Sequence, residues 1–253
     1  MYQFFVEPQQ IDRAAHTVTI TGSDVNHIKN VLRMKIGEEL AVSNGQDGCE
    51  YRCGIEAFEE DCVRCRLYFV KEDAVELPVQ VTLFQGLPKS DKMEFIIQKA
   101  VELGACEIVP VAAKRCVVKL DEKKAAAKVA RWQGISEAAA KQSKRGIIPT
   151  VREVMSFAQA LAYAADMDLC LIPYELAGDR QCTMQDTRAL FATLRPGQRV
   201  AVFIGPEGGF EESEVEAAQR GGARMITLGK RILRTETAGL VVLSWVGYVT
   251  EES

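Results

Sequence analysis

The stretch Val200-Ala-Val-Phe-Ile-Gly-Pro-Glu-Gly-Gly209 decides the fold class of this sequence. Its apolar start predicts a buried strand, and its glycine-rich end predicts a turn into a helix that begins near Glu211. A second strand over 225–228 and a second turn over 229–238 lead into a last apolar helix over 237–249. Strand-to-helix junctions of this kind are typical of α/β sheets, which bind ligands beyond the carboxyl ends of their strands. We therefore expect the functional site at these two turns.

The alternation of strands and helices extends upstream to Pro78. Further strands are predicted over 79–84, 107–111 and 168–172, and further helices over 92–103, 121–144 (one helix or two) and 187–194. This order implies a mainly parallel sheet that helices cover on both faces. The fold class predicted for this part of the chain is α/β.

The N-terminal part of the chain has a different pattern, with short strands of period-two alternation and turn signals at Asn44-Gly45 and Asp47-Gly48. One helix over 23–33 interrupts the strands, and Ser23 is its expected N-cap. These elements fit a small β-barrel. The strands are expected over 17–20, 39–42, 51–55 and 63–70, and the apolar face of the helix is expected to consist of Val25, Ile28, Val31 and Leu32.

An acidic segment over 71–77 ends at Pro78 and is the expected linker between two parts of the chain. We therefore predict two domains, a small barrel over 1–72 and an α/β domain over 73–253. The chain has 253 residues, of which 47% are hydrophobic, so each part can form a core. No run of 18 apolar residues occurs and the N-terminus lacks a signal-peptide pattern, which leads us to expect a soluble cytoplasmic protein.

The eight cysteines are scattered and lie mostly within apolar alternation, which is typical of reduced thiols that pack as small hydrophobic side chains. One cluster, Cys49, Cys53, Cys62 and Cys65, has four thiols for zinc in principle. Because both pairs lie within strand patterns and lack turn glycines, coincidence is favoured over a metal site. No metal is expected.

The net charge of −4 argues against a nonspecific coat for nucleic acid, but the charge is unevenly distributed. Between residues 114 and 152 there are eleven basic and three acidic residues, so this segment carries +8 and the remainder −12. Segregation of this kind indicates a surface for a polyanion, whereas the alternative is an ordinary solvated helix face. The basic residues are Lys114, Arg115, Lys119, Lys123, Lys124, Lys128, Arg131, Lys141, Lys144, Arg145 and Arg152.

The first turn, 205–209, matches neither the phosphate-binding loop of nucleotide hydrolases nor the dinucleotide fingerprint. Its three glycines offer positive φ angles and close approach of the backbone to a ligand. In the second turn, the apolar pair Ile232-Leu233 is flanked by Arg231 and Arg234, and the acid and hydroxyls that follow are expected to cap the last helix. Apolar contacts beside backbone donors suit an adenine ring, and a guanidinium suits an anion.

Several long motifs together resemble one family. Ile204-Gly-Pro-Glu-Gly-Gly-Phe210 paired with Leu228-Gly-Lys-Arg-Ile-Leu-Arg-Thr-Glu-Thr-Ala238 is similar to the SPOUT methyltransferases, and within them to the RsmE type that methylates N3 of a uridine in 16S ribosomal RNA of the small subunit. The resemblance covers essentially the whole chain. It extends to Gln85-Gly-Leu-Pro-Lys-Ser-Asp-Lys-Met-Glu94, Ile97-Gln-Lys-Ala-Val-Glu-Leu-Gly104, Glu137-Ala-Ala-Ala-Lys-Gln-Ser-Lys-Arg145 with Ile148-Pro149, and Asn26-His27 through Val31-Leu-Arg33.

The resemblance implies a PUA-like, RNA-binding barrel over 1–72 and a SPOUT methyltransferase domain over 73–253. It also implies a deep trefoil knot near the C-terminus, a feature that is rare among folds. The implied cofactor is S-adenosylmethionine, the implied substrate is 16S ribosomal RNA within the small subunit, and the implied assembly is a homodimer without a membrane partner.

Residue by residue, the resemblance gives a set of expected functional positions. The cofactor pocket is expected to include Leu171, Pro173, Glu175, Ile204, Gly205, Glu207, Gly208, Leu228, Gly229, Ile232, Leu233, Thr235 and Ala238. The expected catalytic residues are Arg234, Glu236 and Arg145. The expected RNA contacts are Lys29, Arg33, Lys114, Arg115, Gln142, Lys144 and Arg145.

The chemistry of such a reaction requires that uracil N3 lose its proton before it can attack a methyl group. We expect Arg234 or Arg145 to stabilise the anionic base, while Arg234 has the alternative role of a partner of Glu236 at the helix start. The only histidines, His16 and His27, lie in the barrel, so a histidine relay is not expected. Two other functions stay open: methylation of a ribose 2′-hydroxyl by a related enzyme, and RNA binding by an assembly factor without catalysis.

Overall fold

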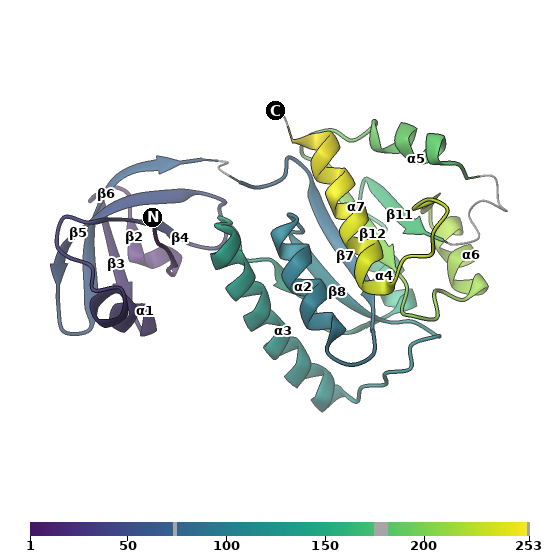
Figure 1. Ribbon diagram of the computed structural model, residues 1–253, viewed down its shortest axis with the longest axis horizontal. Coiled ribbons are helices and arrows are strands. Elements are labelled where there is room, and N and C mark those ends of the chain that lie inside the picture. The colour runs from purple at the N-terminus through teal and green to yellow at the C-terminus, as the bar shows by residue number, and fades with distance from the viewer. Residues whose placement is uncertain (73–74, 175–181, 252–253) are drawn as a thin grey trace. The chain divides into compact units, whose positions relative to one another are not determined.

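The computed structural model describes residues 1–72, 75–174 and 182–251 (Figure 1). The chain forms two compact units. Unit 1 contains Met1–Glu76 and Ala140–Ile148, and unit 2 contains Leu77–Ala139 and Pro149–Ser253. Unit 1 therefore includes a segment that is distant in sequence from the rest of it.

A six-stranded sheet in the order β1-β4-β5-β6-β3-β2 makes up most of unit 1. Neighbouring strands are antiparallel except for β1 and β4, which are parallel. One face of the sheet packs its alternate side chains into a core that includes Phe4, Val18, Leu40 and Tyr51. The strands are β1 (Gln3–Phe5), β2 (Ile11–Asp12), β3 (Thr17–Thr21), β4 (Glu39–Ser43), β5 (Glu50–Phe58) and β6 (Cys62–Lys71), with a 3-10 turn at Pro8–Gln10. The four predicted strands are confirmed as β3 to β6.

The predicted helix over 23–33 is present in a shorter and irregular form. Gly22, with a φ of 75°, takes the N-cap position expected for Ser23, and α1 (Ser23–Asn26) runs directly into a π-helical turn, His27–Val31. A π turn has more residues per turn than an α-helix, so it rotates later side chains away from the predicted face. Val25 and Ile28 are buried as expected, whereas Val31 is 63% exposed.

The segment 140–148 packs against the loop between β4 and β5 in unit 1. The backbone N–H of Ile148 donates to the carbonyl oxygen of Gly45 at 2.9 Å, and Gly45 also forms a parallel bridge with Ile147. Gly146 lies so close to Gly48 that a Cβ atom at residue 146 would be 2.3 Å from the Gly48 carbonyl oxygen. A residue without a side chain is therefore required at this contact.

Unit 2 is built on a seven-stranded sheet in the order β10-β8-β7-β12-β11-β13, with β9 also paired to β8, and every one of these pairs is parallel. The predicted parallel α/β sheet is thus confirmed. Its strands are β7 (Gln80–Gly86), β8 (Glu107–Ala112), β9 (Thr150–Val151), β10 (Met155–Ser156), β11 (Leu169–Pro173), β12 (Arg199–Ile204) and β13 (Arg224–Ile226). The helices are α2 (Lys92–Glu102), α3 (Glu122–Ser143), α4 (Phe157–Ala164), α5 (Met184–Phe191), α6 (Glu212–Arg220) and α7 (Thr235–Thr250).

Alternation along the central strands assigns different helices to the two faces of this sheet. Phe84 of β7 stacks on Phe203 of β12 with ring centroids 4.3 Å apart, and Phe157 at the start of α4 contacts the same ring. The neighbouring residues Leu83 and Ile204 point to the opposite face, where Gly239 of α7 lies against both. On that face α2 and α7 lie side by side (Figure 1).

Two helices of unit 2 differ from the sequence prediction. The helix expected over 187–194 begins earlier, at Met184, because the Thr183 hydroxyl accepts the backbone N–H of Asp186 and so caps the helix there. Helix α4 and the short strands β9 and β10 were not predicted. In the part of the chain that is described, no helix is both long and apolar enough to cross a membrane.

Candidate cofactor pocket and active site

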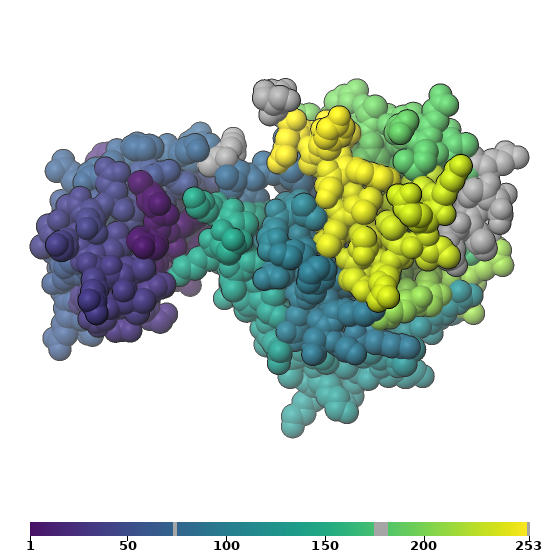
Figure 2. Space-filling model, in the orientation of Figure 1, coloured from purple at the N-terminus to yellow at the C-terminus, as the bar shows by residue number. Residues whose placement is uncertain are grey.

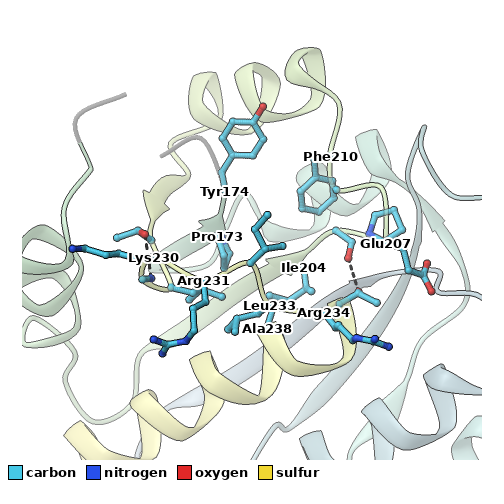
Figure 3. A pocket seen from close by; sticks show the side chains of 18 of the residues that line it. Pro173, Tyr174, Ile204, Glu207, Phe210, Lys230, Arg231, Leu233, Arg234 and Ala238 are labelled. Atoms are coloured by element: carbon cyan, nitrogen blue, oxygen red, sulfur yellow. Dashed lines mark hydrogen bonds between the residues drawn. The ribbon is translucent and has the colours of Figure 1, made fainter. Parts of the chain in front are cut away.

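A cavity of about 420 Å³ lies in unit 2 beyond the carboxyl ends of β11, β12 and β13, where the sequence predicts the site (Figure 3). Two loops supply most of its wall, the turn after β12 and the segment between β13 and α7. The lining residues are Lys92, Pro173, Tyr174, Ile204, Gly205, Pro206, Glu207, Gly209, Phe210, Ala238 and the run from Thr227 to Thr235.

The turn after β12 is tight, but only one of its three glycines has a positive φ. Gly209 has a φ of 66°, and a Cβ atom on Gly205 would be 3.0 Å from the Gly209 backbone. Gly205 and Gly208 do not use the positive-φ freedom that glycine offers, and their lack of a side chain allows close approach of neighbouring groups instead. Gly208 faces Arg115, whose Cβ would lie 3.3 Å from a Cβ at residue 208.

The second loop carries the chain from the sheet edge back to its centre. It leaves β13, whose only described sheet neighbour is β11, and enters α7, which packs on β12 and β7. Gly229 has a φ of 98°, and its backbone N–H donates to the Thr227 hydroxyl at 3.3 Å. This path takes residues 227–234 past the ends of the strands and forms one side of the cavity.

Thr235, the first residue of α7, joins the two loops. Its hydroxyl donates to the carbonyl oxygen of Gly205 at 2.6 Å and accepts a hydrogen bond from Nε2 of Gln85 at 2.9 Å. The hydroxyl was expected to cap the helix, but the N-cap is Arg234, which makes no side-chain cap bond. The Thr235 side chain instead fixes the start of α7 to the turn after β12, and Gln85 is fully buried beneath it.

An ion-pair cluster stands at the wall of the cavity. Lys92, the first residue of α2, lies 3.2 Å from Glu207 and 3.1 Å from Glu236. Burial acts to raise the pKa of each carboxyl group, but hydrogen bonds from each residue's own backbone N–H, together with the Lys92 ammonium, outweigh it and lower the pKa of Glu207 and Glu236. Hydrogen bonds to Glu236 and Glu207 raise the pKa of Lys92 in turn. All three side chains therefore stay charged.

Most of the expected pocket residues line this cavity; of the described ones, Leu171 and Gly208 are not among the lining residues, and neither is the expected catalytic residue Glu236. Leu171 is fully buried within the sheet. Glu236 stands behind the wall, next to Lys92, while Glu175 lies outside the described residues. Arg234 lines the cavity with a side chain that is 81% exposed, and one of its nitrogens is 4.0 Å from Glu236.

Lys114 and Arg115, two expected RNA contacts, lie next to the turn after β12. Arg115 donates to the carbonyl oxygen of Gly208 at 3.1 Å, and Lys114 pairs with Glu211 at 2.7 Å. Both side chains are attached to unit 2 close to the cavity wall.

The other expected RNA contacts belong to unit 1. Arg145 is buried and its guanidinium binds the carboxylate of Glu76, with Nε 3.0 Å from Oε2. Lys29 donates to the backbone carbonyl oxygen of Glu60 at 3.3 Å. The remaining three residues are exposed, and they are Arg33, Gln142 and Lys144.

The basic segment 114–152 is partly neutralised in the structure. Ion pairs join six of its basic residues to carboxylates elsewhere in the chain or in the same helix. The six are Lys114, Lys124, Arg131, Lys141, Arg145 and Arg152. The positive charge available to a polyanion is therefore smaller than the sequence count suggests.

The four clustered cysteines lie in unit 1. Burial raises the pKa of Cys53 and of Cys65 to about 12, so both thiols stay protonated in the core. Within the described ranges, no group of three or more His, Cys, Asp or Glu side chains is placed to hold a metal ion.

Sequence reasoning missed several residues of the wall, among them Lys92, Tyr174 and Phe210. Tyr174 directly follows the strand end at Pro173, and Phe210 directly follows the glycine turn, so proximity to those signals would have included them. Lys92 had no such signal, because a lysine at the start of an amphipathic helix looks like any solvated charge.

The fold and the pocket define a class of protein, the RNA methyltransferases that carry a PUA domain. Residues 75–247 match the family model of an RNA methyltransferase domain, and residues 20–61 match that of an RNA methyltransferase PUA domain.

Comparison with individual relatives of known sequence or structure narrows this class to one family. The ribosomal RNA small subunit methyltransferase E of Bacillus subtilis is 42% identical over 99% of this chain and 98% of its own. The crystal structure of the enzyme of that name from Neisseria gonorrhoeae, bound to S-adenosyl methionine, has a TM-score of 0.80 at 31% identity and covers 99% and 98% of the two chains. A putative methyltransferase of Legionella pneumophila in complex with the same cofactor has a TM-score of 0.77 at 30% identity, over 97% and 96%. The chain belongs to the family of ribosomal RNA small subunit methyltransferase E.

Proposed function

We propose that the protein uses S-adenosylmethionine to methylate N3 of a uridine in 16S ribosomal RNA of the small subunit. The observation that carries this proposal is the cavity formed by the turn after β12 and the loop before α7, in a chain whose relatives at 31% and 30% identity have been solved with that cofactor. The cofactor supplies an electrophilic methyl group bound to a sulfonium.

The residues of the cavity fit such a cofactor. Its volume of about 420 Å³ falls in the range of small-molecule sites. Ile204, Leu233 and Ala238 offer apolar surface to an adenine ring, and the backbone of residues 227–234, which line the cavity, can offer donors and acceptors. The remaining proposed cofactor contacts are Pro173, Glu175, Gly205, Glu207, Gly208, Leu228, Gly229, Ile232, Thr235 and, beneath the cavity, Leu171.

We assign the chemistry to residues at the start of α7. Arg234 lines the cavity and Glu236 lies next to Lys92, so both stand close to a base that enters from solvent. For Arg145 the predicted role requires that its guanidinium leave Glu76. N3 lies on the pairing edge of uracil, so the target nucleotide has to leave its stack before it enters the cavity.

RNA recognition is assigned to both units. Lys114 and Arg115 would contact RNA beside the cavity, and the exposed residues Arg33, Gln142 and Lys144 would contact it in unit 1, together with Lys29. The match of residues 20–61 to an RNA methyltransferase PUA domain supports this assignment.

We further propose a homodimer, a trefoil knot and a cytoplasmic location. Helix α7 is uncovered along its length on the face seen in Figure 2, with Tyr248 87% exposed and Val249 also exposed, which supports a protein partner on this helix.

The return of the chain from β13 at the sheet edge to α7 over β12 supports a threaded C-terminus. A ribosomal RNA substrate in a bacterial family supports the cytoplasm.

Calorimetry with S-adenosylmethionine, followed by mass mapping of methyl groups on ribosomal RNA, tests the function. We expect binding of the cofactor and one methyl group on a uracil. A methyl group on a ribose would indicate the related ribose enzyme, and binding of RNA without any methyl transfer would indicate an assembly factor. Naked 16S RNA and small subunits from a strain that lacks the enzyme would serve as parallel substrates.

Replacement of Arg234 by alanine should lower turnover and leave the affinity for S-adenosylmethionine unchanged. The side chain is largely exposed at the cavity. Its loss therefore removes the cation that would stabilise the anionic base, but removes little of the surface that would contact the cofactor. Steady-state kinetics and calorimetry on the same preparation check this. Unchanged turnover would mean that Arg234 only accompanies Glu236 at the helix start.

A further inference from the structure

Helix stability does not explain the position of Lys92. It is the first residue of α2, where the helix dipole disfavours a positive charge. Glu207 does not depend on it, because the backbone N–H of Lys89 already donates to this carboxylate at 3.1 and 3.4 Å. The ammonium nonetheless lies in the cavity wall.

The two carboxylates leave part of the ammonium unused. An ammonium group has three N–H donors. The ion pairs with Glu207 and Glu236, at 3.2 and 3.1 Å, occupy at most two of them. The third is available to a ligand in the cavity that Lys92 lines.

Charge in the cluster is balanced around this donor. Arg234, 4.0 Å from Glu236, offsets the second carboxylate, so Lys92, Arg234, Glu207 and Glu236 together are neutral. Because its carboxylate partners raise the pKa of Lys92, the group stays an ammonium at neutral pH. It therefore acts as a hydrogen-bond donor and not as a base.

We propose that Lys92 is a catalytic residue, whose third N–H donates to a carbonyl oxygen of the target uracil as N3 loses its proton. This inference rests on the proposed function. When the N3–H bond breaks, its electron pair stays on the ring, the proton passes to solvent water, and negative charge spreads onto the two carbonyl oxygens next to N3. A fixed cation beside one of these oxygens stabilises the anionic base more than the neutral base. Glu207 and Glu236 act through Lys92 as positioning residues.

Substitution of Lys92 by methionine, with a second variant carrying arginine, tests the proposal. We expect Lys92→Met to lower kcat about a hundredfold, the usual effect of removing one such donor, with S-adenosylmethionine affinity within about threefold of the parent. Lys92→Arg keeps the charge and should recover part of the loss. The control is Lys99→Met, which removes a lysine of the same helix that pairs with Glu102 away from the cavity.

A substrate with a more acidic N3 separates this role from a structural one. RNA in which 5-fluorouridine replaces uridine loses the N3 proton more easily, so it depends less on a stabilising cation. The defect of Lys92→Met should shrink at least tenfold on this RNA, and its activity on normal RNA should recover as pH rises. An equal defect on both RNAs, or a variant as active as the parent, would overturn the proposal.

The outcomes are distinct from a failure of the proposed function. If the parent protein binds no S-adenosylmethionine or methylates no uracil, the proposed function is wrong. If the parent is active but circular dichroism shows that Lys92→Met is unfolded, Lys92→Arg replaces it in the assay. The activity of Lys92→Arg is then measured on normal and on fluorinated RNA, and its smaller defect must also shrink on the fluorinated RNA.

Discussion

At the scale of single residues, the pocket depends on one hydroxyl group. Thr235 donates to Gly205 and accepts from Gln85, so one side chain connects a buried strand, the turn after it and the last helix. Removing a partner from buried polar groups costs about 1–3 kcal/mol, because the groups left behind stay without a bond. For the stability of this site, the two hydrogen bonds of Thr235 therefore outweigh the weak helix propensity of threonine.

Replacement of Thr235 by valine, which has nearly the same shape, should destabilise unit 2 by about 1–3 kcal/mol and weaken cofactor binding. Urea unfolding and calorimetry measure the two effects. The control is Thr237→Val, which changes an exposed threonine of the same helix and should alter stability by less than about 0.5 kcal/mol. Equal behaviour of the two variants would show that the hydroxyl of Thr235 does not hold the loops together.

At the scale of secondary-structure elements, α3 and the segment after it contribute to both units. The helix has a glycine in its middle, Gly134, where a Cβ atom would meet no atom within 4 Å, and a glycine soon after its end, Gly146, where a Cβ would collide with the Gly48 backbone. The same substitution is thus expected to have opposite effects at two positions near one element.

Gly146→Ala should destabilise unit 1 by about 1–3 kcal/mol, because both contacting groups are backbone and neither can rotate away. Gly134→Ala should stabilise the helix by up to about 1 kcal/mol through helix propensity. Hydrogen exchange followed along the chain assigns each change to its unit. Stabilisation by Gly146→Ala would contradict the packing of segment 140–148 on the loop around Gly48.

The elements also indicate how far sequence could predict this structure. Period-two and helical patterns located the central strands of both units because burial on one or both faces imposes those patterns. The π turn that exposes Val31 could not be predicted, since one inserted residue per turn leaves no mark in composition. The two site loops were predicted from glycines and charges, whereas Lys92 was not, because its significance lies in two carboxylates that are distant in sequence.

At the scale of the whole molecule, the uncovered face of α7 has the properties of an interface. Tyr248 has 87% of its surface exposed near the end of an apolar helix, its neighbour Val249 is also exposed, and contiguous exposed apolar side chains mark interaction sites. We expect the protein to sediment as a dimer at micromolar concentration.

Tyr248→Glu should convert this dimer to monomers, because a charge at the interface would have to be buried without a partner. Analytical ultracentrifugation measures the change. The control is Val117→Glu, which introduces the same charge at another exposed apolar residue. A monomeric parent protein would contradict the homodimer.

The division of the chain into units has a consequence for dissecting the protein. The backbone passes from one unit to the other three times, after Glu76, Ala139 and Ile148. An excised N-terminal piece ending at Glu76 would lack the nonapeptide 140–148, and with it Arg145, the partner of Glu76. Such a fragment should gain order when that nonapeptide is added in trans, as a split protein does when its missing segment is supplied as a peptide.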